Sequence, residues 1–141
     1  MFSKTILFVS ALASGALAAP AIQARQTDLP WTLTAFTRTC DDAANTCHYS
    51  FGVQQNDGPQ ILPACDYTIH GTTQSARITD YQSQPCGPSW LINQGHDPNG
   101  FIVVVVTDTA KHERAFYGYE DAWLVDGQAV TPDVSSPPQA T

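Results

Sequence analysis

The sequence predicts an all-β domain, a small antiparallel β-sandwich or barrel of about eight strands with two disulfides. Apolar and polar residues alternate with a period of two along much of the chain. Clusters of Gly, Pro, Asn, Asp and Ser separate the alternating runs, as turns do between short strands. Beyond residue 18 no segment has the 3.6-residue period of an amphipathic helix, so we expect no long helix in the domain.

The first three expected strands place aromatic and apolar residues on one face, and they are residues 31–39, 47–53 and 65–69. In the first of them Trp31 and Leu33 alternate with threonines, which is typical of a half-buried strand. Phe36 breaks this alternation, which indicates either a β-bulge or a strand that is apolar on both faces. Residues 56–59, Asn-Asp-Gly-Pro, are expected to form a turn.

The later expected strands are residues 76–81, 90–94, 101–107, 114–119, 122–125 and 128–130. Residues 84–89 are expected to form a loop, and the sequence from His96 to Gly100 is a strong turn signal. The run 101–107 contains four consecutive valines, which disfavour a helix and predict a central strand that is buried on both faces. Asp126 and Gly127 predict a tight hairpin turn.

Residues 1–18 are expected to be a secretory signal peptide, because Lys4 precedes a short apolar stretch that ends in Ala16-Leu-Ala18. That stretch is shorter than the roughly 20 apolar residues of a membrane-spanning helix, so membrane insertion is not expected. The protein is therefore expected to be secreted and extracellular.

Residues 19–25 form a candidate pro-segment, and the mature chain would begin at Ala19 or at Gln26. The remainder has the size of one domain, which we assign to residues 26–133. Residues 134–141, rich in Ser and Pro, are expected to be a flexible tail.

The four cysteines all follow the leader, and they are Cys40, Cys47, Cys65 and Cys86. An even number in an exported chain predicts two disulfides, for which three connectivities exist. Chain entropy does not choose among them. A hairpin would bring Cys40 opposite Cys47 at bridging distance, so geometry favours Cys40–Cys47 with Cys65–Cys86. Without a Cys-x-x-Cys motif or a histidine pair at ligand spacing, no metal site is predicted.

The charge balance excludes one class of partner. The chain has six basic and thirteen acidic residues and a formal net charge of −7, and its basic residues are dispersed. Such a chain would be repelled by the phosphates of a nucleic acid and by an anionic membrane. Nucleic-acid binding is therefore not expected.

Signatures of catalysis and of cofactor binding are missing from the sequence. It contains no Gly-x-Ser-x-Gly, no His-Glu-x-x-His, no phosphate-binding glycine loop and no EF-hand pattern. Two adjacent acidic pairs, at residues 41–42 and 120–121, do not form glycosidase carboxylates alone, because neighbours on a strand point to opposite faces. We predict no catalytic residues and no cofactor.

Five aromatic residues form a candidate binding surface for a glycan or an apolar ligand, namely Trp31, Trp90, Tyr117, Tyr119 and Trp123. The alternative is that most of them belong to the core of the small domain. Tyr117 and Tyr119 share one side of their strand, which suits either alternative.

Several segments together resemble a known group of proteins. They are residues 31–40, 46–51, 63–67, 99–106, 119–121 and 130–133. The chain resembles small secreted cysteine-containing proteins of filamentous ascomycetes, some of which are hypersensitive-response-inducing elicitors. The resemblance implies a compact secreted β-domain that plant cells perceive as a trigger of immunity. It implies no catalytic residues.

Three functions are compatible with these observations. The leading hypothesis is a non-enzymatic secreted fungal effector or elicitor that a plant cell-surface or apoplastic protein recognises. The second is a secreted binding module for a cell-wall glycan or small apolar ligand, which tryptophans sharing an exposed face or a cleft would favour. The third, a small hydrolase or ribonuclease, requires a histidine and a carboxylate that converge in a pocket.

Overall fold

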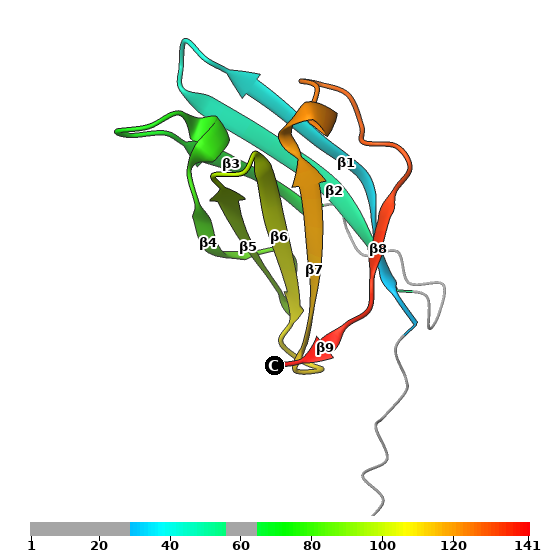
Figure 1. Ribbon diagram of the computed structural model, residues 1–141. Coiled ribbons are helices and arrows are strands. Elements are labelled where there is room, and N and C mark those ends of the chain that lie inside the picture. The colour runs from blue at the N-terminus through cyan, green and yellow to red at the C-terminus, as the bar shows by residue number, and fades with distance from the viewer. Residues whose placement is uncertain (1–28, 56–64) are drawn as a thin grey trace, which may run out of the picture.

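A computed structural model of the chain describes residues 29–55 and 65–141. Two antiparallel sheets pack face to face, which confirms the predicted fold class (Figure 1). The first sheet has the strand order β3-β2-β1-β8. Its strands are β1 (Trp31–Asp41), β2 (Thr46–Gln55), β3 (Cys65–His70) and β8 (Val134–Ser136).

The second sheet has the strand order β4-β5-β6-β7-β9. Its strands are β4 (Tyr81–Pro85), β5 (Trp90–Asp97), β6 (Phe101–Asp108), β7 (Glu113–Glu120) and β9 (Gln139–Ala140). Two short 3-10 turns, η1 (Ala76–Ile78) and η2 (Asp121–Trp123), are the helical elements within the described residues. Neither has the length or the apolar character to span a membrane.

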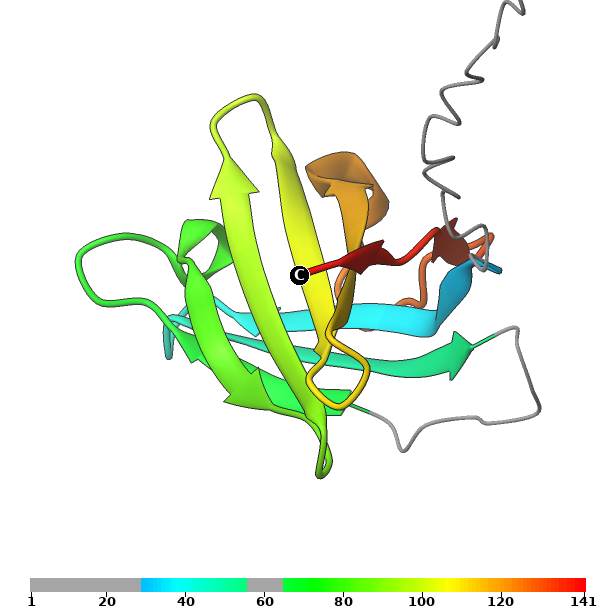
Figure 2. The same cartoon turned by 90° about the horizontal axis from the view of Figure 1, so that it is seen from below.

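Consecutive strands form each sheet as a meander, and the last two strands then add one to each sheet. β1 to β3 form the first sheet and β4 to β7 the second, and the strands of the two sheets cross at an angle (Figure 2). β8 then pairs with β1, and β9 pairs with β7 at Glu113 and Arg114. Residues 134–141 are thus not the flexible tail that their composition predicts, because their backbone hydrogen-bonding groups join the edges of both sheets.

A bulge in β1 explains the broken alternation at Phe36. The β1–β2 register shifts between Thr34 and Thr37, and Ala35 has a φ of 52°. The shift turns Phe36 into the core, where it is fully buried together with Leu33. Of the two interpretations that the sequence leaves open, the structure selects the bulge.

β6 occupies the centre of its sheet, between β5 and β7. Ile102, Val104 and Val106 are fully buried between the sheets, whereas Val103 and Val105 are partly exposed on the outer face. The prediction of a strand buried on both faces is therefore wrong. No layer of the described structure covers the outer face of this sheet, so alternate valines remain accessible to solvent.

Other expectations need smaller corrections. The strand expected at 76–81 is the 3-10 turn η1 followed by the start of β4, and the strand expected at 122–125 overlaps η2. The turn at Gly127, with a φ of 76°, is present, but the residues after it form only an isolated bridge between Thr37 and Ala129. The leader, the candidate pro-segment and the turn at 56–59 lie outside the described residues.

The disulfides follow the sequential arrangement. Cys40 and Cys47 face each other across the β1–β2 hairpin, as its geometry predicts. Cys65 at the start of β3 is bonded to Cys86, the residue after β4. Because β3 and β4 are edge strands of different sheets, the second disulfide joins the sheets covalently along one side of the sandwich.

Candidate functional site

Four of the five aromatics predicted as a candidate binding surface lie in the core. Trp31 and Trp90 are 2% and 6% exposed and contact each other with ring centroids 5.2 Å apart. Tyr117 and Tyr119 are fully buried, and the Tyr117 hydroxyl donates a hydrogen bond to the backbone oxygen of Trp31. Burial raises the pKa of both phenols far above the ordinary value. These four side chains point inward from three different strands, so they form no common exposed surface.

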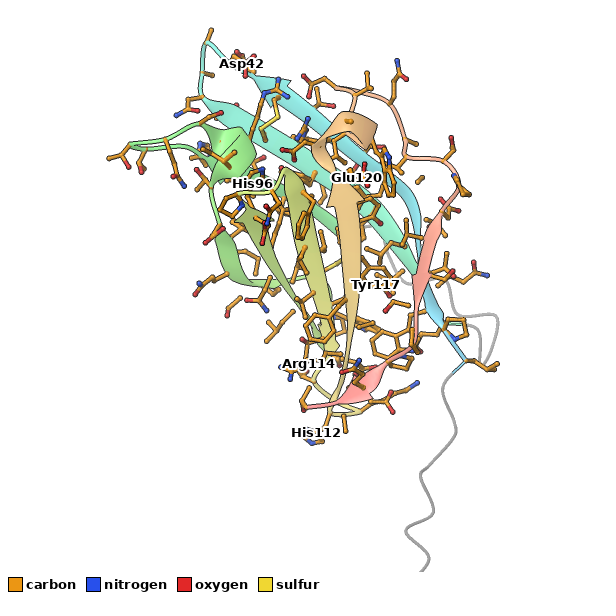
Figure 3. The ribbon with its side chains drawn as sticks, in the orientation of Figure 1. Asp42, His96, His112, Arg114, Tyr117 and Glu120 are labelled. Atoms are coloured by element: carbon orange, nitrogen blue, oxygen red, sulfur yellow. A yellow bond between two sulfur atoms is a disulfide. The ribbon has the colours of Figure 1, made fainter. Side chains whose placement is uncertain are left out.

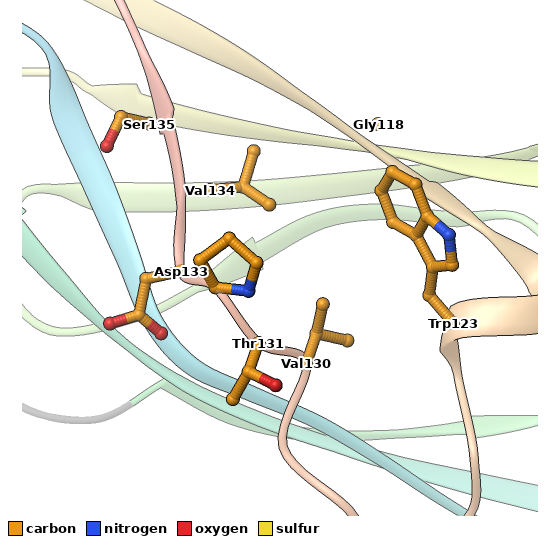
Figure 4. Close-up of a pocket in the computed structure, with 8 residues that line it drawn as sticks. Gly118, Trp123, Val130, Thr131, Asp133, Val134 and Ser135 are labelled. Carbon is orange, nitrogen blue, oxygen red and sulfur yellow. The ribbon is translucent and has the colours of Figure 1, made fainter.

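Trp123 is the exception. It stands on η2, 49% exposed, beside a cleft of about 420 Å³. We call this space the edge cleft, and its lining residues are Gly118, Trp123, Val130, Thr131, Pro132, Asp133, Val134 and Ser135. Figure 4 shows the indole of Trp123 on one side of the space and Val130 and Val134 on the other.

The edge cleft exists because two neighbouring edges belong to different sheets. β7 continues to Glu120, but β9 pairs with it only at Glu113 and Arg114. The next segment of chain, residues 130–136, is held on β1 instead. The backbone nitrogen of Val130 donates to the oxygen of Phe36, and β8 pairs with residues 31–33. Gly118 of β7 and residues 130–135 therefore line a space that no strand of the described structure fills.

The walls of the cleft are mainly apolar, with Trp123, Val130, Pro132 and Val134 as the large contributors. Two of the three polar side chains in the lining are already engaged. Asp133 accepts a hydrogen bond from the backbone nitrogen of Ala35, and the Ser135 hydroxyl lies 2.8 Å from that of Thr32. The cleft thus offers apolar surface with few uncommitted polar side chains.

The free edge of β7 contributes main-chain groups. Residues of an antiparallel strand direct their N–H and C=O groups alternately to either side. The nitrogen of Asp121 donates to Gly100 on the β6 side, whereas the oxygen of His112 accepts from Thr141 on the β9 side. The β6–β7 register is continuous between these points, so even-numbered residues face outward. Phe116, Gly118 and Glu120 therefore direct their backbone groups toward the open edge, where no described strand pairs with them.

Two histidine–carboxylate pairs lie elsewhere. His96 Nε2 is 2.9 Å from Asp121 Oδ2, and His48 is paired with Asp66 on the exposed face of the first sheet. His96 and His112 lie toward opposite ends of the second sheet (Figure 3). Neither pair lines the edge cleft. Within the described residues no three His, Cys, Asp or Glu side chains are grouped in a way that would hold a metal ion.

Charged side chains also brace the end of the molecule that carries η2. The Arg77 guanidinium donates to Asp126 and to Asp42, and these bonds raise its pKa and lower that of Asp126. Arg38, only 5% exposed, donates to the backbone oxygen of Leu124. The two acidic pairs noted in the sequence, residues 41–42 and 120–121, thus have different partners. Asp42 binds Arg77, and Asp121 is paired with His96. These contacts fix the chain that leads into the edge cleft.

Sequence reasoning did not identify the edge cleft. Its lining comes from the end of β7, from η2 and from residues 130–135, which only the tertiary structure brings together. One signal was available at Gly118, because a glycine within a strand often marks a bulge or a close approach of another group. Here a Cβ at position 118 would meet no atom within 4 Å, so the glycine leaves open space beside the cleft.

The fold and the site together define a small disulfide-linked β-domain with an apolar cleft at one sheet edge. Comparison with known proteins gives the particular group. The family model described as Effector TSP1 matches residues 32–141, a range that includes the whole edge cleft, and the chain belongs to this family. It is similar to the protein named Effector TSP1 from Hypocrea virens (strain Gv29-8 / FGSC 10586), with 28% identity over 144 residues. The match covers 96% of this chain and 95% of that protein.

Proposed function

We propose that this protein is a secreted fungal effector that plant cells perceive outside the fungal cell, and that it induces a defence or hypersensitive response. The observation that carries the proposal is membership of the Effector TSP1 family over nearly the whole described domain. The expected signal peptide and the resemblance to secreted elicitors support the same assignment. Its partner would be a plant cell-surface or apoplastic protein.

The chemistry of the domain is suited to the extracellular space. Every cysteine in the described residues is in a disulfide, which is the form that persists in oxidising compartments. We propose that the protein acts by surface recognition without catalysis. Neither histidine–carboxylate pair lines the edge cleft, whose apolar walls are suited to binding.

Infiltration into leaves tests this proposal. Purified protein is applied in its native form and after reduction and alkylation of both disulfides, and cell death and the oxidative burst are recorded. We expect a response to the native protein and a smaller one, or none, to the alkylated form, whose domain has lost its covalent constraints. Absence of any response in a panel of plant species would contradict the proposal.

Secretion needs its own measurement. The protein is expressed from its full gene in a fungus, and the N-terminus of the extracellular product is sequenced. We expect the chain in the culture filtrate to begin at Ala19 or Gln26. Retention of the full-length chain in the cells would contradict the assignment as a secreted effector.

One observation favours a second function, binding of a cell-wall glycan or small apolar ligand. The half-exposed indole of Trp123 borders the edge cleft, and an accessible tryptophan can stack on a sugar ring or an apolar ligand. Titration of tryptophan fluorescence with chitin and glucan oligosaccharides tests this function. Flat titrations with all of them would remove it.

A further inference from the structure

We propose that the edge cleft binds an extended polypeptide segment of a partner, which adds as a strand to the free edge of β7. In this arrangement one apolar side chain of the segment contacts Trp123, and a cationic side chain lies near Glu120. The inference rests on the proposed function and deepens it, because it names the chemistry of the partner at the site.

The main chain of β7 provides the first argument. Phe116, Gly118 and Glu120 direct their N–H and C=O groups to the open edge, at the spacing that an antiparallel partner strand requires. An unpaired edge is a template for strand addition, a common mode of peptide recognition. The protein's own β9 uses the same edge at Glu113 and Arg114, so the edge accepts a strand.

The sequence explains why β9 stops where it does. Two consecutive prolines precede it at positions 137 and 138, and proline has no N–H to donate to a ladder. The two prolines also form the connection between β8 in the first sheet and β9 in the second. The pairing that β9 begins at Arg114 therefore cannot continue within the chain, and the edge from Phe116 onward remains available.

The cleft beside this edge provides the second argument. An added strand would direct alternate side chains toward opposite faces of the sheet. The cleft beside Gly118 is bordered by Trp123, Val130 and Val134, and its volume of about 420 Å³ is near the lower end for ligand sites. A space of this size and lining is suited to one apolar side chain anchored by the main chain on β7.

Charge provides the third argument, because the free edge of β7 is acidic at one end and basic at the other. Glu120 stands at its η2 end and Arg114 at its β9 end, as Figure 3 shows. Asp121 follows Glu120, and Asp133 lies in the cleft. The chain as a whole carries a net charge of −7. A cationic residue at the end of the segment that meets Glu120 would therefore be favoured over an acidic one.

A peptide suits these groups better than a glycan. Glycan sites commonly supply several polar side chains, but Asp133 and Ser135 already have partners on β1, which leaves the Thr131 hydroxyl. The unsatisfied polar groups at the cleft are instead the backbone groups of β7, which a peptide backbone complements in both donors and acceptors.

The test uses three probes with the ¹⁵N-labelled folded domain in NMR titrations. The first is the peptide acetyl-Lys-Thr-Leu-Thr-Val-amide, and the second is the same peptide N-methylated at the nitrogens that would face β7. The third is chitohexaose. We expect shifts from the first peptide at Phe116, Gly118, Glu120 and the Trp123 indole. Loss of one or two hydrogen bonds should weaken the N-methylated peptide about tenfold or more.

Three variants locate the interaction. Trp123→Ala removes the apolar wall, and Gly118→Pro removes an outward N–H without touching the β6 ladder; each should weaken the peptide about tenfold. Ile78→Ala, at an exposed site on η1, is the matched control and should leave binding unchanged. If Gly118→Pro does not fold, the comparison of the parent peptide with the N-methylated peptide on the wild-type domain tests the same main-chain hydrogen bonds.

Three outcomes would overturn the inference. Equal binding of the parent and N-methylated peptides would mean cleft filling without strand addition. Shifts at Trp123 with chitohexaose but with neither peptide would make the cleft a glycan site. No binding of any probe would mean that the edge cleft binds neither a peptide nor a glycan of these kinds. The leaf response to the wild-type protein is measured separately, so its failure contradicts the proposed function and leaves the peptide titrations to be interpreted alone.

Discussion

The two sides of the sandwich are closed in different ways. Where β3 and β4 meet, the Cys65–Cys86 disulfide joins the sheets, and Tyr67 is stacked between Tyr49 and Tyr81 with ring centroids 5.3 and 4.8 Å apart. We call this side the closed seam. We call the side where β7 and β8 meet the open seam. Neither disulfide of the described residues joins these two strands, and the edge cleft lies between their edges.

This difference separates stability from recognition. Both seams contain the exposed edges that a sandwich must protect from unwanted pairing. The closed seam protects its edges with a covalent bond and buried rings. The open seam has a short strand, β9, on only part of β7, and leaves the rest accessible. Substitutions at the closed seam should therefore affect folding, whereas those at the open seam should affect binding.

The largest effect is expected from Tyr67→Ala. This side chain is buried between two stacked tyrosines, and its hydroxyl donates to Gln94 across the sheets, 2.7 Å away. Removal of the ring should lower the free energy of unfolding by about 3–5 kcal/mol in urea titrations. Tyr67→Phe, which removes only the hydroxyl, should cost about 1–2 kcal/mol because Gln94 loses its partner. Equal losses for the two variants would mean that the stack contributes nothing.

The next effect compares the two disulfides. Replacement of Cys65 and Cys86 by serine opens a longer loop than replacement of Cys40 and Cys47, with separations of 21 and 7 residues. Loop entropy gives losses of about 3.4 and about 2.5 kcal/mol, measured by denaturant unfolding under oxidising conditions. A larger loss for the hairpin disulfide would argue against the covalent link as the main stabiliser of the closed seam.

A smaller effect is expected from Asp126→Asn. Hydrogen bonds from Arg77 lower the pKa of Asp126, and the carboxylate also accepts from the nitrogen of Cys40. Because the folded-state pKa is depressed, this contribution is present above the ordinary carboxyl pKa of about 3.9 and is lost as the pH falls through the folded value. With partial exposure taken into account, the variant should lose about 1–2 kcal/mol at pH 7.

The pH dependence provides the control for this prediction. Unfolding of the wild-type protein and of Asp126→Asn is compared at pH 7 and at a series of lower pH values, because the Asp126 carboxyl group becomes protonated as the pH falls through its depressed folded-state pKa. The difference between the two proteins should shrink toward the lower pH. A constant difference would assign the loss to packing instead of charge.

The smallest effect on stability is expected from Trp123→Ala. Half of this side chain is exposed on η2, so its removal should cost less than about 1 kcal/mol in the same unfolding experiment. Binding of the strand-forming peptide should nevertheless fall. A stability loss as large as that of Tyr67→Ala would make the cleft wall part of the core and would remove the contrast between the seams.

Local pattern was sufficient for much of the fold. Period-two alternation located β2 and β3, because it depends only on which face of a strand is buried. The four valines located the centre of the second sheet, because β-branched residues favour strands. Pattern failed at residues 76–78 and 122–123, where parts of the expected strands are 3-10 turns. Such short segments do not distinguish a strand from a turn unless the surrounding structure is known.

The site was less accessible to sequence analysis. Trp31, Trp90 and Trp123 look alike in the sequence, but only the last is exposed beside a cleft. Residue type does not reveal burial when an aromatic ring can serve either a core or a surface. The cleft itself joins Gly118 with residues 130–135, and that juxtaposition depends on the return of the chain to both sheets.

The sequence by itself therefore determined an all-β domain with two disulfides, because alternation and cysteine spacing are local properties of the chain. Only the tertiary structure decided which edges meet and which of them stays open. The C-terminal residues 134–141 illustrate the division. Their composition predicts a loose tail, but the unpaired edges of β1 and β7 provide partners for their backbone groups. Where that pairing stops, the edge cleft begins.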